Sequence, residues 1–308
     1  MLNYILRRIG QAIPTLLIVI TASFFLMHVA PGGPFDNAQQ LPPEIEANLK
    51  AAYHLNLPVW QQYLYYMKDL LHGDFGPSFE YKDTSVTALI VQGFPVSLKL
   101  GSWAMLLALV IGIPMGIIAA IRRNSVIDYI VMGIALCGIA IPNFVLAPIM
   151  ALVFGVFLAW LPAGGWGNGG LSYIVLPVIA LSIQQIAAIA RLTRASMIEV
   201  IESQYIKTAK AKGLSGMEII LRHALRPALL PVLSYLGPAI AAIITGSVVI
   251  EQIFGLPGIG RYFVQGALNR DYTLVMGVVV FYAMLIILMN LVVDLLYGFI
   301  DPQIALDE

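Results

Sequence analysis

Long runs of apolar residues dominate the chain and alternate with shorter polar segments. Six of the runs are long enough to cross a bilayer as a helix, which takes about 20 residues. They lie near residues 9–30, 96–120, 128–159, 173–191, 228–250 and 273–299. Of the 308 residues, 59% are hydrophobic and 11% are charged, and the mean hydropathy is +0.86, outside the range of soluble proteins. The pattern predicts an all-α polytopic membrane protein with six transmembrane helices.

The polar segments divide the chain into expected parts. Residues 1–30 hold the first transmembrane helix, which we expect to remain as an uncleaved anchor because its apolar run is longer than that of a signal peptide. Residues 31–95 form a small helical insertion outside the cell membrane, and residues 96–299 form a core with the other five helices. The core includes a polar segment at 193–227, and residues 300–308 form a short tail.

Two helices are predicted within the insertion. Pro42 and Pro43 suit a helix start before Glu44 to Tyr53, and a second helix runs from Val59 to Leu71. The aromatic and apolar residues expected on one side of the second helix are Trp60, Tyr63, Leu64, Met67 and Leu71. Either they anchor the insertion at the membrane interface, or the insertion covers the outer mouth of a pathway or meets an external partner.

The distribution of lysine and arginine predicts the orientation, because positively charged loops resist translocation. With the N-terminus inside, eleven of the 17 basic residues face the cytoplasm: Arg7, Arg8, Arg122, Arg123, Arg191, Arg194, Lys207, Lys210, Lys212, Arg222 and Arg226. Both termini are then cytoplasmic. The formal net charge is zero, so nothing indicates a nucleic-acid partner, and the single cysteine, Cys137, excludes an intrachain disulfide.

Several residues inside the apolar runs break the apolar pattern. Pro142 removes a helical hydrogen bond, so a kink is expected at Ile141-Pro142-Asn143, either lining a cavity or in a tilted helix whose freed carbonyl meets a neighbour. Gln184 and Gln185 favour a polar pathway or helix-to-helix hydrogen bonds equally. The candidate pathway residues are Pro142, Asn143, Gln184, Gln185 and Ser247.

Charged and small residues near the ends of the runs suggest structural roles. Arg191, Arg194, Glu251 and Asp294 are expected to snorkel or to form ion pairs rather than to take part in transport. The spacing Gly112-Ile-Pro-Met-Gly116 is typical of a face that lets two helices approach closely.

The polar segment 193–227 contains a short helix with a clear stop and restart. The helix is predicted from about Glu202 to Lys212, with Gly213 as the left-handed residue that closes it. Ser215 and Glu218 form a capping box before the next apolar stretch. An isolated helix this short is marginal in water, so it must pack on a groove of another protein, on the chain's own spans or on anionic lipid.

Sequence motifs for catalysis are missing or out of place. The chain has no G-x-x-x-x-G-K-[ST] phosphate loop and no H-E-x-x-H zinc motif. Gly213-Leu-Ser-Gly216 matches the G-x-S-G of intramembrane serine proteases, but Ser215 follows lysines outside the predicted spans and is better explained as a helix cap. We therefore expect no catalytic residue, no metal ligand and no cofactor in this chain.

Long strings of the sequence resemble one family in the same order along nearly the whole chain. They include LRRIGQAIPTLLIVITASFFLMHVAPGGPF near the start, HGDFGPS at 72–78, the segment from Ser196 to Pro238, EQIFGLPGIG at 251–260 and the closing DLLYGFIDP. The chain is similar to transmembrane permease subunits of ATP-binding-cassette importers, in the peptide and nickel branch.

The generic importer motif E-A-A-x3-G-x9-I-x-L-P is altered in this chain. Lys207, Thr208 and Ala209 hold the E-A-A places, and His223 and Leu225 hold the I and L places, whereas Thr208 to Leu214 matches the T-A-x-A-K-G-L form of the peptide branch. The resemblance implies that this helix couples the permease to an ATPase. The implied coupling residues are Tyr205, Lys207, Thr208, Ala209, Ala211, Lys212, Gly213 and Leu214.

The resemblance also implies partners. They are a second, homologous permease, two ATPase subunits that bind ATP and magnesium, an extracytoplasmic peptide-binding protein and an oligopeptide cargo, all at a bacterial inner membrane. A dipeptide, nickel or murein-peptide importer of the same branch is an alternative. So is a secondary transporter driven by an ion gradient, although such a protein needs a buried coupling carboxylate and Asp294 is the nearest one.

Overall fold

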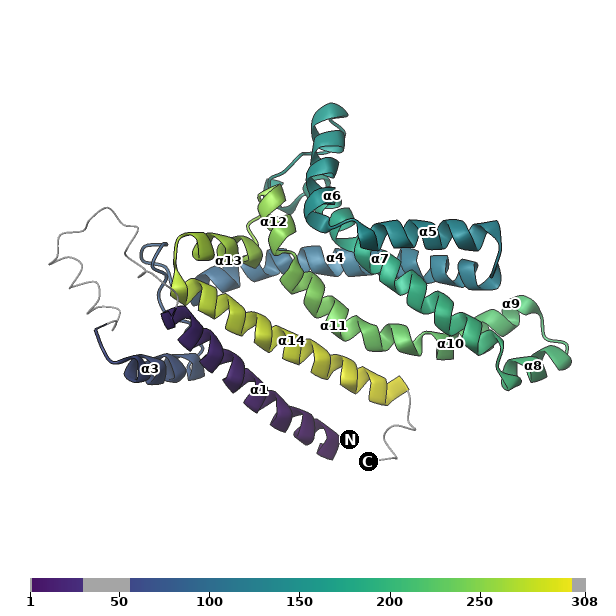
Figure 1. Cartoon of the computed structure of the whole chain (residues 1–308), viewed down its shortest axis with the longest axis horizontal. Coiled ribbons are helices and arrows are strands. Elements are labelled where there is room, and N and C mark those ends of the chain that lie inside the picture. The colour runs from purple at the N-terminus through teal and green to yellow at the C-terminus, as the bar shows by residue number, and fades with distance from the viewer. Residues whose placement is uncertain (1, 30–55, 301–308) are drawn as a thin grey trace. The chain divides into compact units, whose positions relative to one another are not determined.

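The part of the chain that the structure describes folds almost entirely into helices, as predicted (Figure 1). The computed structural model describes the backbone of residues 2–29 and 56–300 and the side chains of 10–29, 56–245 and 247–293. Within these ranges the only pairing of extended backbone is an isolated bridge between Pro77 and Ser85. The predicted helix from Glu44 to Tyr53 and the side chain of Asp294 lie outside the described residues.

The described chain divides into two compact units. The first comprises Leu98–Leu256 and the chain from Leu288, and the second comprises Leu2–Ser97 and Pro257–Ile287. The helices are α1 (Leu2–Val29), α3 (Val59–Leu71), α4 (Val86–Ile121), α5 (Val126–Ala140), α6 (Asn143–Met150), α7 (Leu171–Ile201), α8 (Gln204–Ala211), α9 (Gly216–Glu218), α10 (Leu225–Ala228), α11 (Leu230–Gly246), α12 (Val248–Phe254), α13 (Ile259–Leu268) and α14 (Tyr272–Ile300). Two π-helical segments, η1 (Ala151–Phe157) and η3 (Ile219–Ala224), and a short 3-10 turn, η2 (Gly167–Gly169), complete them.

Five helical stretches in the described residues are long and apolar enough to span a membrane. They are Gly10–Val29, Val86–Ile121, Leu171–Ile201, Leu230–Phe254 and Tyr272–Val293. The sixth predicted span is instead two helical pieces, Val126–Ala140 and Asn143–Phe157, that meet at 99°. The prediction of six spans holds only if this bent pair counts as one.

The bend between α5 and α6 is sharper than the predicted kink, and it is a complete break in the helix. Ile141 has an extended backbone (φ −87°, ψ 116°), and Pro142 follows with φ −65° and ψ 144°. A residue before proline is pushed away from the helical region, and proline offers no amide hydrogen, so α5 ends at Ala140. At the break itself, the Ile141 carbonyl accepts a hydrogen bond from Gln184 Nε2 of α7 at 3.5 Å.

The first unit is built around α7, which packs closely on α4 and α5. A Cβ atom added at Gly116 of α4 would lie 2.5 Å from Thr193 Cβ and 2.6 Å from the Ala190 carbonyl oxygen. One added at Gly112 would lie 2.9 Å from the Ile186 carbonyl oxygen. The Gly112–Gly116 face is therefore a close-packing face, as predicted, and its partner is α7.

In the second unit α3 packs on α1 through aromatic residues. The Tyr63 hydroxyl lies 2.7 Å from Thr21 Oγ1, and the rings of Tyr63 and Tyr66 lie 5.3 and 6.0 Å from that of Phe24. Burial raises the pKa of the Tyr66 phenol.

The predicted apolar side of α3 is divided between the core of the unit and its surface. Tyr63 and Met67 pack against the core, whereas Trp60, Leu64 and Leu71 are exposed, and Tyr66 and Leu70, which lie outside the predicted set, also contact the core. The face of α3 that packs on α1 therefore includes Tyr66, whose ring, like that of Tyr63, contacts the ring of Phe24.

A buried carboxylate ties the loop after α3 to the start of α14. Asp271 is completely buried and accepts hydrogen bonds from Ser78 Oγ at 2.5 Å and from the amides of Phe79 and Glu80 at 3.0 and 3.2 Å. It also accepts one from the amide of Leu274 at 3.0 Å, as a helix N-cap does. The loop that carries HGDFGPS is thereby fixed to the end of a span.

Candidate functional site

The short helix α8 follows α7 after only Glu202 and Ser203, and it ends as predicted. Gly213 has φ +82°, which is the left-handed region. The Gly213 amide donates to the Lys210 carbonyl at 2.9 Å, and the Leu214 amide donates to the Ala209 carbonyl at 3.3 Å. These two bonds form a Schellman motif, in which glycine is preferred because it has no Cβ.

The next helix begins at the predicted cap. Ser215 Oγ accepts a hydrogen bond from the Glu218 amide at 3.3 Å. The Glu218 carboxylate pairs with Arg222 at 3.0 Å, so it does not serve the cap as a full capping box would require. Ser215 is thus engaged as a helix cap, which accounts for the G-x-S-G string without a nucleophile.

One face of α8 packs against the rest of its own unit. Ile206 is completely buried and Ala209 is 6% exposed, within a cluster that also contains Ala120 of α4, Met197 of α7 and residues of η3 and α10. Leu214 packs against the same cluster. The alternative that the helix rests on the chain's own spans is therefore correct for this face.

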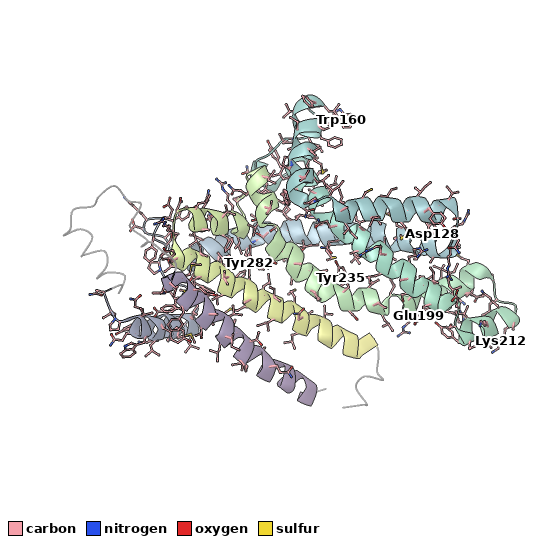
Figure 2. All side chains as sticks on the ribbon, in the orientation of Figure 1. Asp128, Trp160, Glu199, Lys212, Tyr235 and Tyr282 are labelled. Carbon is pink, nitrogen blue, oxygen red and sulfur yellow. The ribbon has the colours of Figure 1, made fainter. Side chains whose placement is uncertain are left out.

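The other face of α8 is exposed. Of the eight predicted coupling residues, Tyr205, Lys207, Thr208, Ala211, Lys212 and Gly213 are exposed, whereas Ala209 and Leu214 belong to the inner face. With about 3.6 residues per turn, Lys207, Thr208 and Ala211 lie opposite the buried pair Ile206 and Ala209. Lys212 stands at the end of the helix (Figure 2). The outward face thus combines small side chains with flanking positive charge.

Two of the five candidate pathway residues, Gln184 and Gln185, bond to neighbouring parts of the helical unit. Gln184 donates a hydrogen bond to the Ile141 carbonyl, and Gln185 accepts one from the Tyr235 hydroxyl of α11 at 2.7 Å. Asn143, the first residue of α6, has a buried Oδ1 without a partner among the described residues. The two glutamines therefore do join helices, the second of the two roles predicted for them.

Ser247 and Glu251 form a buried polar pair near the end of the α11–α12 span. Both residues are completely buried, and Ser247 Oγ donates to Glu251 Oε1 at 2.5 Å. Glu251 therefore does not snorkel to the membrane surface. Its carboxyl group is held inside the unit.

A buried ion pair escaped the sequence analysis. Asp128 of α5 pairs with Arg194 of α7, for which pairing was one of the two expected roles, but the acidic partner was not foreseen. A local signal was present, because Ser125-Val-Ile-Asp128 resembles a capping box and Ser125 Oγ accepts from the Asp128 amide at 3.4 Å.

Two family profiles match most of the chain. The profile of a family described as "Binding-protein-dependent transport system inner membrane component" matches residues 112–306, and the profile of its N-terminal part matches residues 1–101. The chain belongs to this family. It is a multi-pass protein of the inner membrane and a permease subunit of the importer class that the resemblance indicated.

Individual relatives cover the whole length. The chain is 58% identical over 304 residues to the oligopeptide transport system permease protein OppB of Escherichia coli (strain K12), covering 99% of each chain. It is 46% identical to the dipeptide transport system permease protein DppB of Bacillus subtilis (strain 168), covering 100% of this chain and 99% of that one.

The comparison with solved structures bears on the fold and not on the function. An inward-facing structure of the MetNI methionine ABC transporter superposes with a TM-score of 0.60 at 20% identity, over 69% of this chain and 96% of the other. The helical core of the permease class is therefore present in this chain.

Proposed function

We propose that this chain is one of the two permease subunits of an ATP-binding-cassette importer for oligopeptides. The observation that carries the proposal is the 58% identity to an oligopeptide permease over 99% of both chains. The chain would form half of the translocation pathway, and the other half would come from a second, homologous permease. Both termini would face the cytoplasm.

The chemical work belongs to partner subunits in this proposal. Two ATPase subunits bind ATP and magnesium and hydrolyse the nucleotide, and an extracytoplasmic peptide-binding protein delivers the cargo. The missing phosphate loop in this sequence supports the first point, and the description of the family supports the second.

The exposed face of α8 is the proposed contact with an ATPase subunit. Lys207, Thr208 and Ala211 would enter a cleft, flanked by Tyr205 and Lys212. Ala209 and Leu214 would hold the helix on its own unit, and Gly213 would set its end, so these three act on coupling by positioning. Support comes from the small outward side chains and from the packing of only one face.

The pathway proposal is confined to the α5–α6 break and its surroundings. Pro142 opens the helix, and the unpartnered Asn143 Oδ1 can accept a hydrogen bond from a peptide amide. Gln184, Gln185 and Ser247 would shape the pathway through the helices that they join.

A bulky residue at Ala211 tests the coupling face. Ala211 is exposed, so Ala211→Trp leaves the packing of α8 intact but fills the space that a docked cleft would need. We expect the ATPase subunits to be lost from the purified complex and peptide uptake to fall by about tenfold or more, since a few kcal/mol at an interface centre suffice.

Ala211→Ser is the matched control and should retain both properties. Normal ATPase co-purification and uptake with Ala211→Trp would rule out this face as the docking surface.

Dipeptides are a second candidate cargo, supported by the 46% identity to a dipeptide permease. Uptake of labelled peptides of graded length by cells that carry the chain and its partners distinguishes the two. Uptake confined to dipeptides would replace the oligopeptide proposal.

A further inference from the structure

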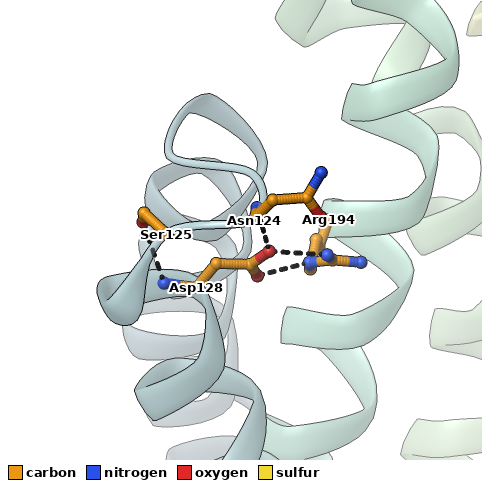
Figure 3. A network of polar contacts seen from close by, with 4 residues as sticks. All are labelled: Asn124, Ser125, Asp128 and Arg194. Atoms are coloured by element: carbon orange, nitrogen blue, oxygen red, sulfur yellow. Dashed lines mark hydrogen bonds and ion pairs between the residues drawn. The ribbon is translucent and has the colours of Figure 1, made fainter.

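The ion pair between Asp128 and Arg194 is a two-bond polar contact between α5 and α7 of the first unit. Arg194 Nε lies 2.6 Å from Asp128 Oδ1, and Nη2 lies 2.7 Å from Oδ2, so the contact is bidentate (Figure 3). The side chain of Asp128 is 2% exposed and that of Arg194 27%. Two further ion pairs between described side chains, Arg123–Glu202 and Arg222–Glu218, are far more exposed.

Asp128 is also fixed on its own side. Its Oδ2 accepts a hydrogen bond from the Asn124 amide at 2.9 Å, and Asn124 holds a left-handed backbone with φ +62°. Ser125 caps the same helix end. Hydrogen bonds therefore hold the start of α5 and the loop before it together. Arg194 binds this segment through a directional, charged contact.

Arg194 lies near the end of α7 that leads into α8, so a displacement of α8 would reach it first through α7. Gly116 of α4 packs on α7 at this level, with its ideal Cβ position 3.0 Å from the Arg194 amide nitrogen. Further along, Met197 of α7 and Ile206 of α8 are both completely buried in one cluster. Only Glu202 and Ser203 separate the two helices. Apolar packing thus joins α8 to α4 and α7. The close packing of α5 on α7 is supplemented by a charged contact at the start of α5.

We propose that Asp128 and Arg194 are positioning residues for transport, which make α5 move together with α7 when α8 is displaced. The far end of α5 is the break at Ile141 and Pro142, where Gln184 of α7 again holds the chain. The pair would therefore carry the movement from the ATPase side to the α5–α6 break. This inference rests on the proposed coupling role of α8.

A double substitution separates force transmission from mere stability. Removing one partner leaves a buried charge without its counter-ion, which is strongly destabilising, whereas neutralising both partners removes that penalty. Asp128→Asn and Arg194→Gln should each lower the midpoint of thermal unfolding. The double variant should recover much of that midpoint, but it lacks the bidentate charged contact.

The experiment measures transport per ATP hydrolysed. The full complex, with its second permease, ATPases and binding protein, is reconstituted in liposomes and supplied with a labelled protease digest of casein as a peptide mixture. We expect the double variant to keep its ATPase subunits and its ATP hydrolysis but to import at least about fivefold less peptide per ATP, the low end of allosteric coupling energies. A double variant whose import per ATP recovers together with its thermal stability would overturn the inference.

The control is the double variant Arg123→Gln with Glu202→Gln. It removes one acid and one base from the same loop and the same end of α7, but this pair is about half exposed. Its import per ATP should stay near the wild-type value, because exposed pairs contribute little. An equal loss in the control would also contradict the inference, because the buried pair would then have no special role.

The two proposals fail in different ways. If the wild-type chain retains no ATPase subunits, or if Ala211→Trp retains them, the coupling role of α8 fails. If ATPase docking behaves as expected but the Asp128–Arg194 double variant imports as much peptide per ATP as the wild type, the inference about the pair fails by itself.

Discussion

Two glycines on α4 determine how closely α7 can approach. At Gly116 a Cβ atom would come within 2.6 Å of both Thr193 and Ala190, which no side-chain rotation of alanine can relieve. Helices in membranes gain stability from such close packing because lipid provides no hydrophobic drive between them. Glycine, the smallest residue, therefore lets α7, which leads into α8, pack closely on α4.

Gly116→Ala should force the two helices apart. We expect a loss of about 1–3 kcal/mol in the free energy of unfolding, as for other overpacked interiors. Thermal unfolding in detergent, followed by the loss of monodisperse protein, measures it. Gly133→Ala is the control, because an added Cβ at Gly133 meets nothing within 4 Å and alanine favours a helix. A midpoint for Gly116→Ala equal to that of the wild type would contradict the packing.

The sequence was most informative for residues whose partners are local. Gly213 and Ser215 were predicted correctly because a helix end is determined by bonds over three to five positions along the chain. The distant contacts of Asp128 and Asp271 were not predicted, because the partners in those contacts lie 66 and about 190 positions away. Hydropathy and capping patterns carry no information on which distant donors gather around one carboxylate.

At the scale of elements, hydropathy does not predict where a helix begins or ends. The span predicted at 96–120 is the apolar part of α4, which in fact begins at Val86. A helix can continue into a polar environment as long as its backbone bonds continue, so the apolar run marks the membrane and not the helix. Proline had the opposite effect in the third run, where it divided one predicted element into α5 and α6.

Asp271 should determine the stability of the loop between α3 and α4. Asp271→Ala removes an N-cap and leaves several buried donors unsatisfied, so we expect a loss of about 2–4 kcal/mol. Limited proteolysis should show faster cleavage in residues 73–85. Asp69→Ala, at an exposed position of α3, should leave cleavage unchanged. Equal protection of the loop in both variants would show that Asp271 does not hold it.

For the molecule as a whole, the number of spans and the distribution of charge determine which segments meet which partner. The chain carries 17 basic and 17 acidic residues, so orientation depends on where the basic ones lie. Eleven of them fall on the side that also carries α8 if the N-terminus is inside. The proposed ATPase contact requires this orientation, because ATP is available only in the cytoplasm.

Accessible cysteines test the orientation directly. Cys137 is the only native cysteine, so Cys137→Ser gives a background in which Lys82→Cys or Met217→Cys introduces one thiol at an exposed position. A membrane-impermeant maleimide should label Lys82→Cys in intact spheroplasts, and it should label Met217→Cys only after the membrane is permeabilised. The reverse pattern would place α8 outside and would make contact with a cytoplasmic ATPase physically impossible, whatever the sequence identity to permeases.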